Sequence, residues 1–392
     1  MAKFKNTYWV LAVAFLSYFA LGLPEGAFGL AWPFIREDMG LPLDIVGIIL
    51  VSSSVAYAAT SALLGRISAF LKLEYIILLG AILMAIGLLV RTFSTGFTML
   101  AILIVVSNIG SGMVDPSLNS YMTSSFSSRY INWLHCSWGI GATMSPILVA
   151  QIILISDWRF VYTVLGGIQV IVVLIILMSI LKGVWKKEKS AVANVQETKQ
   201  ASEKTTYLTR KRHQVMDVFT CFIHGGVQYS MGFWTVSVLL ESRGVYLGYV
   251  GLFPAVFFGS AVVGGIIFGF LANRMSNISM IRVGMAMSFV GVVVLLLTNS
   301  LLGMVLMGLG FAPIFPCFLH GTKNRFSPEK VTKMIGYKVA ALASGVAILS
   351  SLKGLVLARI SLEALFPIAM ILIALTFLMN EILEKNSRKS VV

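Results

Sequence analysis

Residues 40–47 read GLPLDIVG, and 204 positions later residues 244–251 read GVYLGYVG. Each octet begins and ends with glycine, and both belong to a longer register between the two halves of the chain. The same offset of 204 relates Glu37 to Glu241, Gly65 to Gly269, Gly80 to Gly284, Gly87 to Gly291 and Gly141 to Gly345. Near residue 110 the offset becomes 200 and relates Gly110 to Gly310 and Pro116 to Pro316. The pattern indicates an internal duplication.

The composition is that of a membrane protein. Hydrophobic residues make up 58% of the 392 and charged residues 12%, a balance that soluble domains do not have. About 20 apolar residues are needed for a helix to cross a ~30 Å hydrocarbon core. The sequence supplies such a run twelve times, at 7–34, 43–70, 73–93, 97–126, 131–155, 158–182, 214–242, 245–272, 278–299, 301–322, 332–357 and 362–384. We therefore predict an all-α integral membrane protein with 12 transmembrane helices in two pseudo-symmetric six-helix bundles.

The net charge of +14 does not indicate a nucleic-acid partner, because most of the Lys and Arg residues lie in the termini and in loops between the predicted spans. By these spans, 23 of the 30 Lys and Arg residues fall in the termini and in every second loop. The positive-inside rule then predicts a multi-pass protein of the cell membrane with both termini cytoplasmic. The predicted parts are an N-terminal bundle (1–182), a polar cytoplasmic linker (183–213) and a C-terminal bundle (214–392). We expect a monomer in the lipid bilayer.

Two carboxylates lie inside predicted spans, where an ionisable group costs about 2.5–3.5 kcal/mol on insertion scales. Glu25 stands in the stretch GLPEG (22–26), whose proline and glycines are typical of a helix that lines a cavity. Asp115 lies deeper, and Asn119 follows one turn later on the same face. We expect Asp115, with Glu25 or His135, to couple transport to a proton or sodium ion; Glu25 is also a candidate substrate ligand. The alternatives to a functional role are that Glu25 reaches water at the outer surface and that Asp115 forms a hydrogen bond with another helix.

The second half offers further candidates for binding a solute. His224, Gln228 and Trp234 lie in one predicted span, and an amide beside an indole face is typical of sugar sites. Alternatively, Trp234 packs against other helices and His224 forms a hydrogen bond between helices, without binding a solute. Lys338 lies inside another span and could extend to the cytoplasmic interface, pair with an acid or bind an anionic substrate. Lys353 lies near the outer end of that span, and we expect it to extend outward.

Two matching cytoplasmic turns carry a glycine and an arginine. The pairs are Gly65 with Arg66 and Gly269 with Arg274. A glycine there allows close helix crossing and an arginine can bond helix-end carbonyls, so we predict a gating role. These turns resemble the Gly-x-x-x-Asp-Arg loop of the major facilitator superfamily, although both lack the acid.

Longer stretches resemble the fucose permease branch of that superfamily, which includes sodium/glucose cotransporter-like members. They are GLPEGAFGLAWP (22–33), GSGMVDPSLNS (110–120), NWLHCSWGIGATMSP (132–146), GFW (232–234) and APIFP (312–316). The resemblance implies alternating-access uptake of sugars with protons or sodium. Gln228 replaces a glutamate common in the branch, and Lys338 stands in a span that usually carries a glutamine and a proline.

The function predicted is therefore symport of a sugar or related polyol. The alternative is proton-coupled efflux of amphipathic compounds, which the 25 Phe and 19 Met residues permit. No phosphate loop, zinc spacing or nucleophile–base motif indicates an enzyme, a metal or a cofactor beyond the coupling ion. Cys136, Cys221 and Cys317 lie in apolar spans without metal-like spacing, and we interpret them as packing residues.

Overall fold

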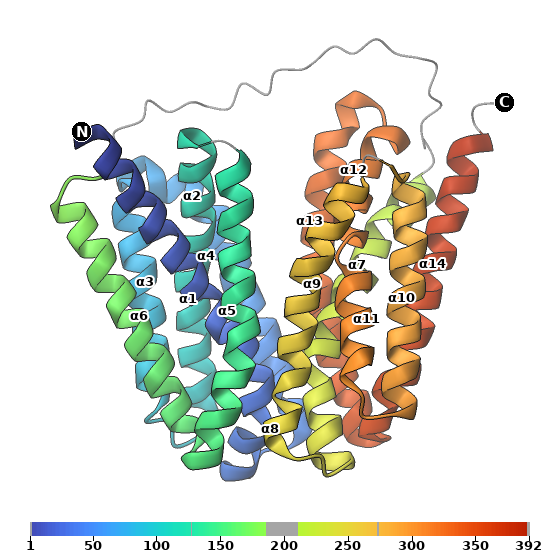
Figure 1. The fold of residues 1–392 in the computed structure, drawn as a ribbon, viewed down its shortest axis with the longest axis horizontal. Helices are drawn as coiled ribbons and strands as arrows, with labels where there is room; N and C mark the ends of the chain where they lie inside the picture. Colours follow the sequence, from blue (N-terminus) through green and yellow to red (C-terminus); the bar gives the residue numbers. More distant parts are fainter. Residues whose placement is uncertain (1, 127, 186–210, 273, 390–392) are drawn as a thin grey trace. The chain divides into compact units, whose positions relative to one another are not determined.

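The computed structural model describes residues 2–126, 128–185, 211–272 and 274–389, which form helices joined by short turns (Figure 1). No strand occurs among these residues. The chain divides into two compact units, Met1–Val195 and Gln196–Val392. Most of the predicted linker, residues 186–210, lies outside the described residues.

The N-terminal unit contains six long helices, each corresponding to one predicted span. They are α1 (Ala2–Asp38), α2 (Val46–Phe70), α3 (Leu73–Arg91), α4 (Phe97–Ser125), α5 (Ser128–Ile155) and α6 (Trp158–Leu181). A short 3₁₀ turn, η1 (Leu43–Ile45), leads into α2. α6 begins after Asp157, whose carboxylate caps the helix by accepting from the Phe160 N–H at 2.8 Å.

In the C-terminal unit, four of the six predicted spans each consist of two helical segments. The six spans are α7 (Lys211–Ser237) with η2 (Val238–Ser242), α8 (Leu247–Val250) with α9 (Leu252–Leu271), α10 (Asn277–Leu297), α11 (Leu301–Phe311) with α12 (Ile314–Arg325), α13 (Pro328–Arg359), and η3 (Leu362–Ala364) with α14 (Leu365–Lys389). The predicted span 301–322 is thus broken around Pro313, because proline lacks the N–H that would continue the helical ladder. α7 begins at Lys211, three residues earlier than predicted.

The helices have the length and composition expected for crossing a membrane. Eleven of the segments in the described chain, including α1, α4 and α13, are long and apolar enough to do so. α7 is not among the eleven, because Asp217, His224 and Gln228 lower its hydropathy. With α7 as the remaining long helix, the fold is the all-α membrane architecture that the sequence predicted.

The same helix pairs pack together in both units. α1 packs mainly along α5, and α3 lies against α4 and α6. In the second unit α7 packs mainly along α13, and α10 lies against α11 and α14. The two halves of the sequence therefore build the same internal arrangement.

Repeated glycines lie where these helices cross. A Cβ on Gly80 would stand 2.7 Å from the Gly110 carbonyl oxygen, and a Cβ on Gly284 would stand 2.5 Å from that of Gly310. At the α7–α13 crossing, a Cβ on Gly345 would collide with the Phe222 carbonyl. Some of the glycines related by the offset of 204 therefore mark close backbone contacts, which are frequent between membrane helices.

The α1–α5 crossing corrects the prediction made for the GLPEG stretch. α1 continues as one helix through Pro24, and a Cβ on Gly26 would stand 2.5 Å from the Ala142 carbonyl oxygen. A Cβ on Gly22 and one on Gly141 would likewise collide with backbone carbonyls of the facing helix. These glycines serve close packing; they do not interrupt the helix.

One pair of glycines instead serves turns. Gly40 and Gly244 follow α1 and η2 with φ of 61° and 59°, a left-handed conformation that side chains disfavour. Near Gly244 the guanidinium of Arg243 binds Glu363 through two contacts of 2.7 and 2.6 Å. The same guanidinium donates to the Leu295 carbonyl at 2.8 Å, so it ties three helix ends of the C-terminal unit together.

Candidate functional site

Asp115 lies in the middle of α4, and side chains from three helices of the N-terminal unit hold its carboxylate. The hydroxyl of Tyr18, on α1, donates to Oδ1, and the hydroxyl of Tyr57, on α2, donates to Oδ2. Asn119 Nδ2 donates to Oδ1 at 2.9 Å. In the part of the chain that the structure describes, no ion pair joins Asp115 to a cation. The carboxylate is thus stabilised by neutral donors and lacks a fixed counter-charge.

This arrangement suits an exchangeable cation. Carboxylate, phenol and amide oxygens are ligands that a proton or a sodium ion can use. A carboxylate in a membrane bundle is costly unless a proton, a cation or hydrogen bonds compensate its charge. The neutral donors around Asp115 provide hydrogen bonds but no positive charge.

Two further predicted residues lie near the tyrosines that bind this carboxylate. Glu25 lies seven residues after Tyr18, about two helical turns away on the same face of α1. Its side chain is exposed and within electrostatic range of the Tyr57 hydroxyl. His135, on α5, is exposed and packs its ring edge-on against Tyr18, with 5.6 Å between the centroids. We call this group the Asp115 cluster: Tyr18, Glu25, Tyr57, Asp115, Asn119 and His135.

Sequence reasoning found four members of the Asp115 cluster and missed Tyr18 and Tyr57. Both tyrosines lie within apolar runs, where a phenol ring is easily counted as packing. Because a buried hydroxyl needs a partner, tyrosines in spans that also carry a carboxylate are the signal that could have identified them.

A second charged group lies inside the C-terminal unit. Asp217, on α7, places Oδ1 2.6 Å from Arg325 Nη1, at the end of α12, and Oδ2 2.6 Å from Lys338 Nζ, on α13. The side chains of Asp217 and Lys338 are 0% exposed and that of Arg325 is 6% exposed. We call these three residues the Asp217 triad.

Lys338 has three oxygen partners inside the C-terminal unit. Its Nζ donates to Thr322 Oγ1 and to the Phe318 carbonyl, both at 2.9 Å, in addition to its ion pair with Asp217. Two of these contacts are hydrogen bonds and the third is the ion pair, so the amine is enclosed by protein oxygens. The residue pairs with an acid across the bundle, so the interpretation that it extends to the interface is wrong. Its predicted role as a substrate ligand is not supported.

Arg325 has partners beyond Asp217. Its Nη2 donates to Asn380 Oδ1 at 2.8 Å, and Glu384 Oε2 lies 3.8 Å away. With Glu384 included, the two cations of the triad are matched by two acids. Sequence reasoning missed this network because Arg325 was assigned to a cytoplasmic loop; the available signal was Asp217, three residues inside a predicted span.

His224 and Trp234 are packed within the C-terminal unit. His224 is buried with its ring edge-on to Phe311 and Phe318, and it lines a cavity of about 10 Å³. Trp234 is fully buried and donates from Nε1 to the Ser350 carbonyl at 3.1 Å. The predicted stacking of a sugar on Trp234 is therefore not supported. Gln228, one turn from His224, is partly exposed.

Lys353 does not extend outward as predicted. Its side chain is 3% exposed, and its Nζ reaches the Gly226 carbonyl at 3.5 Å, the outer limit of a hydrogen bond. No described acid forms an ion pair with it. A buried lysine with one weak contact is unusual in a membrane bundle, and its amine can attract an anion when it is protonated.

Of the residues predicted to form gating turns, Gly65 and Arg66 lie inside α2 and Gly269 lies inside α9; Arg274 lies in a turn. A Cβ on Gly65 or on Gly269 would meet nothing within 4 Å, so neither glycine lies at a close helix crossing in this structure. Arg66 and Arg274 are exposed, and their side chains bond no other described residue. A role of the arginines in gating remains a prediction.

No group of three or more His, Cys, Asp or Glu residues that could hold a metal occurs among the described residues. Cys221 and Cys317 are buried and Cys136 is partly buried, all three as free thiols.

Comparison with known proteins points to a transporter family. The sequence pattern of the Major Facilitator Superfamily matches residues 14–324. The probable sulfoacetate transporter SauU of Cupriavidus necator is 24% identical over 284 residues, or 69% of this chain and 66% of that protein. The multidrug efflux pump SdrM of Staphylococcus aureus is 23% identical over 180 residues, or 45% of this chain and 40% of the pump. The match thus spans less than two thirds of each relative.

A solved structure with the same fold is that of the nucleoside transporter NupG. It superposes with a TM-score of 0.73 at 12% sequence identity, covering 97% of this chain and 98% of that chain. At this identity the likeness concerns the fold alone.

Proposed function

Because the chain belongs to the major facilitator superfamily, we propose that it is a secondary active transporter that moves a small polar solute by alternating access, coupled to a proton or sodium gradient. The observation that carries this proposal is the Asp115 carboxylate, held by Tyr18, Tyr57 and Asn119 and paired with none of the described cationic side chains.

In the coupling step that we propose, Asp115 binds the ion when its carboxylate faces one side and releases it on the other. Tyr18 and Tyr57 keep the carboxylate oxygens oriented during the exchange, and Asn119 donates to Oδ1. Glu25 and His135, both exposed, are the groups through which a proton or ion reaches the cluster. Asp115 is thus the coupling residue, and its neighbours position it.

The substrate class that we propose is a sugar or related polyol. Asn119, Tyr57 and Glu25 offer donors and acceptors of the kind that exchange with hydroxyl groups, and Gln228 adds a partly exposed amide. The resemblance to the fucose permease branch supports this class. His224, Trp234 and Lys338 are buried, so the remaining candidates for solute binding are the Asp115 cluster in the N-terminal unit and, separately, Gln228 in the C-terminal unit.

A small organic anion is a second candidate substrate. The observation in its favour is Lys353, a buried ammonium with one weak contact to a carbonyl. A relative named as a sulfoacetate transporter agrees with this choice. Efflux of amphipathic compounds, the alternative from the sequence, agrees with the name of the relative SdrM.

Counterflow in proteoliposomes tests the function and separates these substrates. The purified protein is loaded with unlabelled fucose, glucose, mannitol or sulfoacetate, and entry of the same labelled solute is measured. We expect exchange of a hydroxylated solute; exchange of sulfoacetate alone, lost in Lys353→Met, would establish the anion instead. Broad drug resistance on overexpression, without solute exchange, would favour efflux.

The coupling role is tested with Asp115→Asn beside a matched control, Asp44→Asn, which removes an acid outside the cluster. Asp115→Asn should keep exchange and lose gradient-driven accumulation, while the control keeps both. Runs with a proton gradient alone and a sodium gradient alone identify the ion. If accumulation by Asp115→Asn matches wild type in both, the carboxylate does not couple.

The remaining features that we propose concern topology. We infer a monomer of the cell membrane with both termini and the linker in the cytoplasm, and domain boundaries at 1–182, 183–213 and 214–392. Labelling of single cysteines at the two termini from either side of sealed vesicles tests the orientation.

A further inference from the structure

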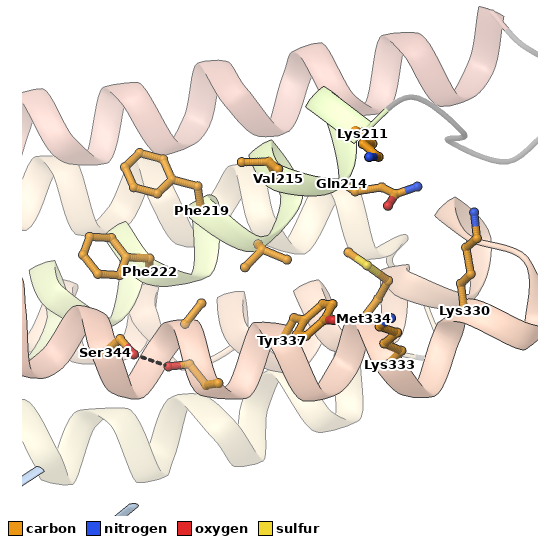
Figure 2. A pocket seen from close by; sticks show the side chains of 13 residues that line it. Lys211, Gln214, Val215, Phe219, Phe222, Lys330, Lys333, Met334, Tyr337 and Ser344 are labelled. Atoms are coloured by element: carbon orange, nitrogen blue, oxygen red, sulfur yellow. Dashed lines mark hydrogen bonds between the residues drawn. The ribbon is translucent and has the colours of Figure 1, made fainter. Parts of the chain in front are cut away.

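A long groove runs between α7 and α13 on the C-terminal unit (Figure 2). Its volume is about 800 Å³, within the range of sites that hold sizeable organic ligands. Both walls are largely apolar: Val215, Phe219 and Phe222 on α7 face Tyr337 and Ala341 on α13. Val215, Phe219 and Tyr337 are exposed by 67%, 45% and 50%, so the C-terminal unit itself leaves this apolar surface uncovered.

One end of the groove is cationic. Lys211 and Gln214, from the start of α7, gather there with Lys330 and Lys333, from the start of α13, while Phe222 and Ser344 lie at the other end (Figure 2). Lys333 Nζ also lies 5.7 Å from the centre of the Tyr337 ring. The described residues that line the groove include no acid, so the three positive charges are not balanced within it.

The dimensions match one leaflet of a membrane. From Lys211 to Phe222, and from Lys333 to Ser344, the chain advances eleven residues, or about 16 Å along a helix. This is roughly half of a ~30 Å hydrocarbon core. The lysines lie at the end that the positive-inside rule predicts to be cytoplasmic, where anionic lipids give the membrane a negative surface potential.

We propose that this groove binds an anionic phospholipid of the cytoplasmic leaflet. The phosphate of the headgroup binds Lys211, Lys330 and Lys333, and an acyl chain lies along Phe219 and Tyr337. A zwitterionic lipid would leave the three positive charges without a matching net charge. This site is separate from the Asp115 cluster, which lies in the other unit of the chain.

The test is native mass spectrometry of the detergent-purified protein titrated with phosphatidylglycerol or phosphatidylcholine. Wild type should bind one phosphatidylglycerol more tightly than any phosphatidylcholine. The variant Lys211→Gln/Lys330→Gln/Lys333→Gln should bind it about 100-fold more weakly, because each lysine contributes about a factor of five near an anionic headgroup. Ala341→Trp should also weaken binding, because it fills the groove without removing a charge.

The matched control is Lys72→Gln/Lys323→Gln/Lys385→Gln, which removes three charges outside the groove and should bind like wild type. Thermal unfolding of each variant verifies that it is folded. Equal binding of the two lipids by wild type, or undiminished binding by the groove lysine variant, would overturn the proposal. If glycerol phosphate competes for the site as strongly as the lipid does, the site recognises only an anion. That result would also overturn the proposal.

Discussion

Removing the acid of the Asp217 triad should destabilise the protein more than removing either of its partners. Asp217→Asn leaves Arg325 and Lys338 buried, with Glu384 at 3.8 Å from Arg325 as the remaining acid. Breaking a buried ion pair in this way costs about 3–5 kcal/mol, since a charge stays out of water without compensation. We expect a loss of about 4 kcal/mol in the free energy of unfolding, at the middle of that range.

The matched change on the other side is milder. Lys338→Met keeps Asp217 paired with Arg325 and loses two hydrogen bonds, to Thr322 and to a backbone carbonyl, so we expect a cost of about 1–2 kcal/mol. The double variant removes one charge of each sign and should cost about 2 kcal/mol, well below the sum of the single changes.

The measurement is unfolding in mixed micelles by titration with sodium dodecyl sulfate, followed by far-ultraviolet circular dichroism. Asp44→Asn in the other unit serves as a control for loss of an acid. A cost below about 1 kcal/mol for Asp217→Asn, or strict additivity in the double variant, would refute the assignment of the triad as a coupled buried network.

Three other changes give separate tests. Gly345→Ala places a methyl group against a backbone carbonyl and should cost about 1–3 kcal/mol, whereas Gly269→Ala, in open space, should be tolerated; equal melting temperatures in detergent would contradict the crossing. Arg243→Lys loses the two-point contact with Glu363 and should cost about 1 kcal/mol in the same melting assay, while an unchanged melting temperature would show that the contact contributes nothing. Tyr57→Phe removes a donor to a carboxylate, worth about 1.5–3 kcal/mol, and should lower gradient-driven accumulation at least about 10-fold with exchange retained; accumulation like that of wild type would remove this tyrosine from the coupling site.

The fold could be predicted from the sequence because the lengths of the apolar segments and the repeated positions of glycine and proline can be read directly from it. Twelve apolar runs predicted the long helices, and the glycine register predicted that the halves share one design. The break at Pro313 and the early start of α7 were missed, since neither changes the length of the apolar run much. Hydropathy finds a span more readily than it finds an interruption inside one.

The site was harder to predict from the sequence than the fold. The position of a residue in the sequence does not tell which face of its helix packs against the neighbouring helices. Tyr18 and Asp115 are 97 residues apart, and Asp217 and Arg325 are 108 apart. Polar residues at depth were found singly, as with Asp115 and Lys338, because their cost is visible in the sequence. Their partners were missed because pairing depends on helix rotation, which the packing decides.

The glycine crossings also limit how either unit can change shape. At Gly345 the carbonyl of Phe222 occupies the space in which any side chain would begin, and Gly284 and Gly310 approach each other in the same manner. A shift of one residue along either helix would bring a methyl or larger group onto that oxygen, so sliding is blocked at these points. The helices of a bundle are therefore fixed against each other at these glycine contacts. Any bending within the bundle has to occur in the helical segments on either side of them.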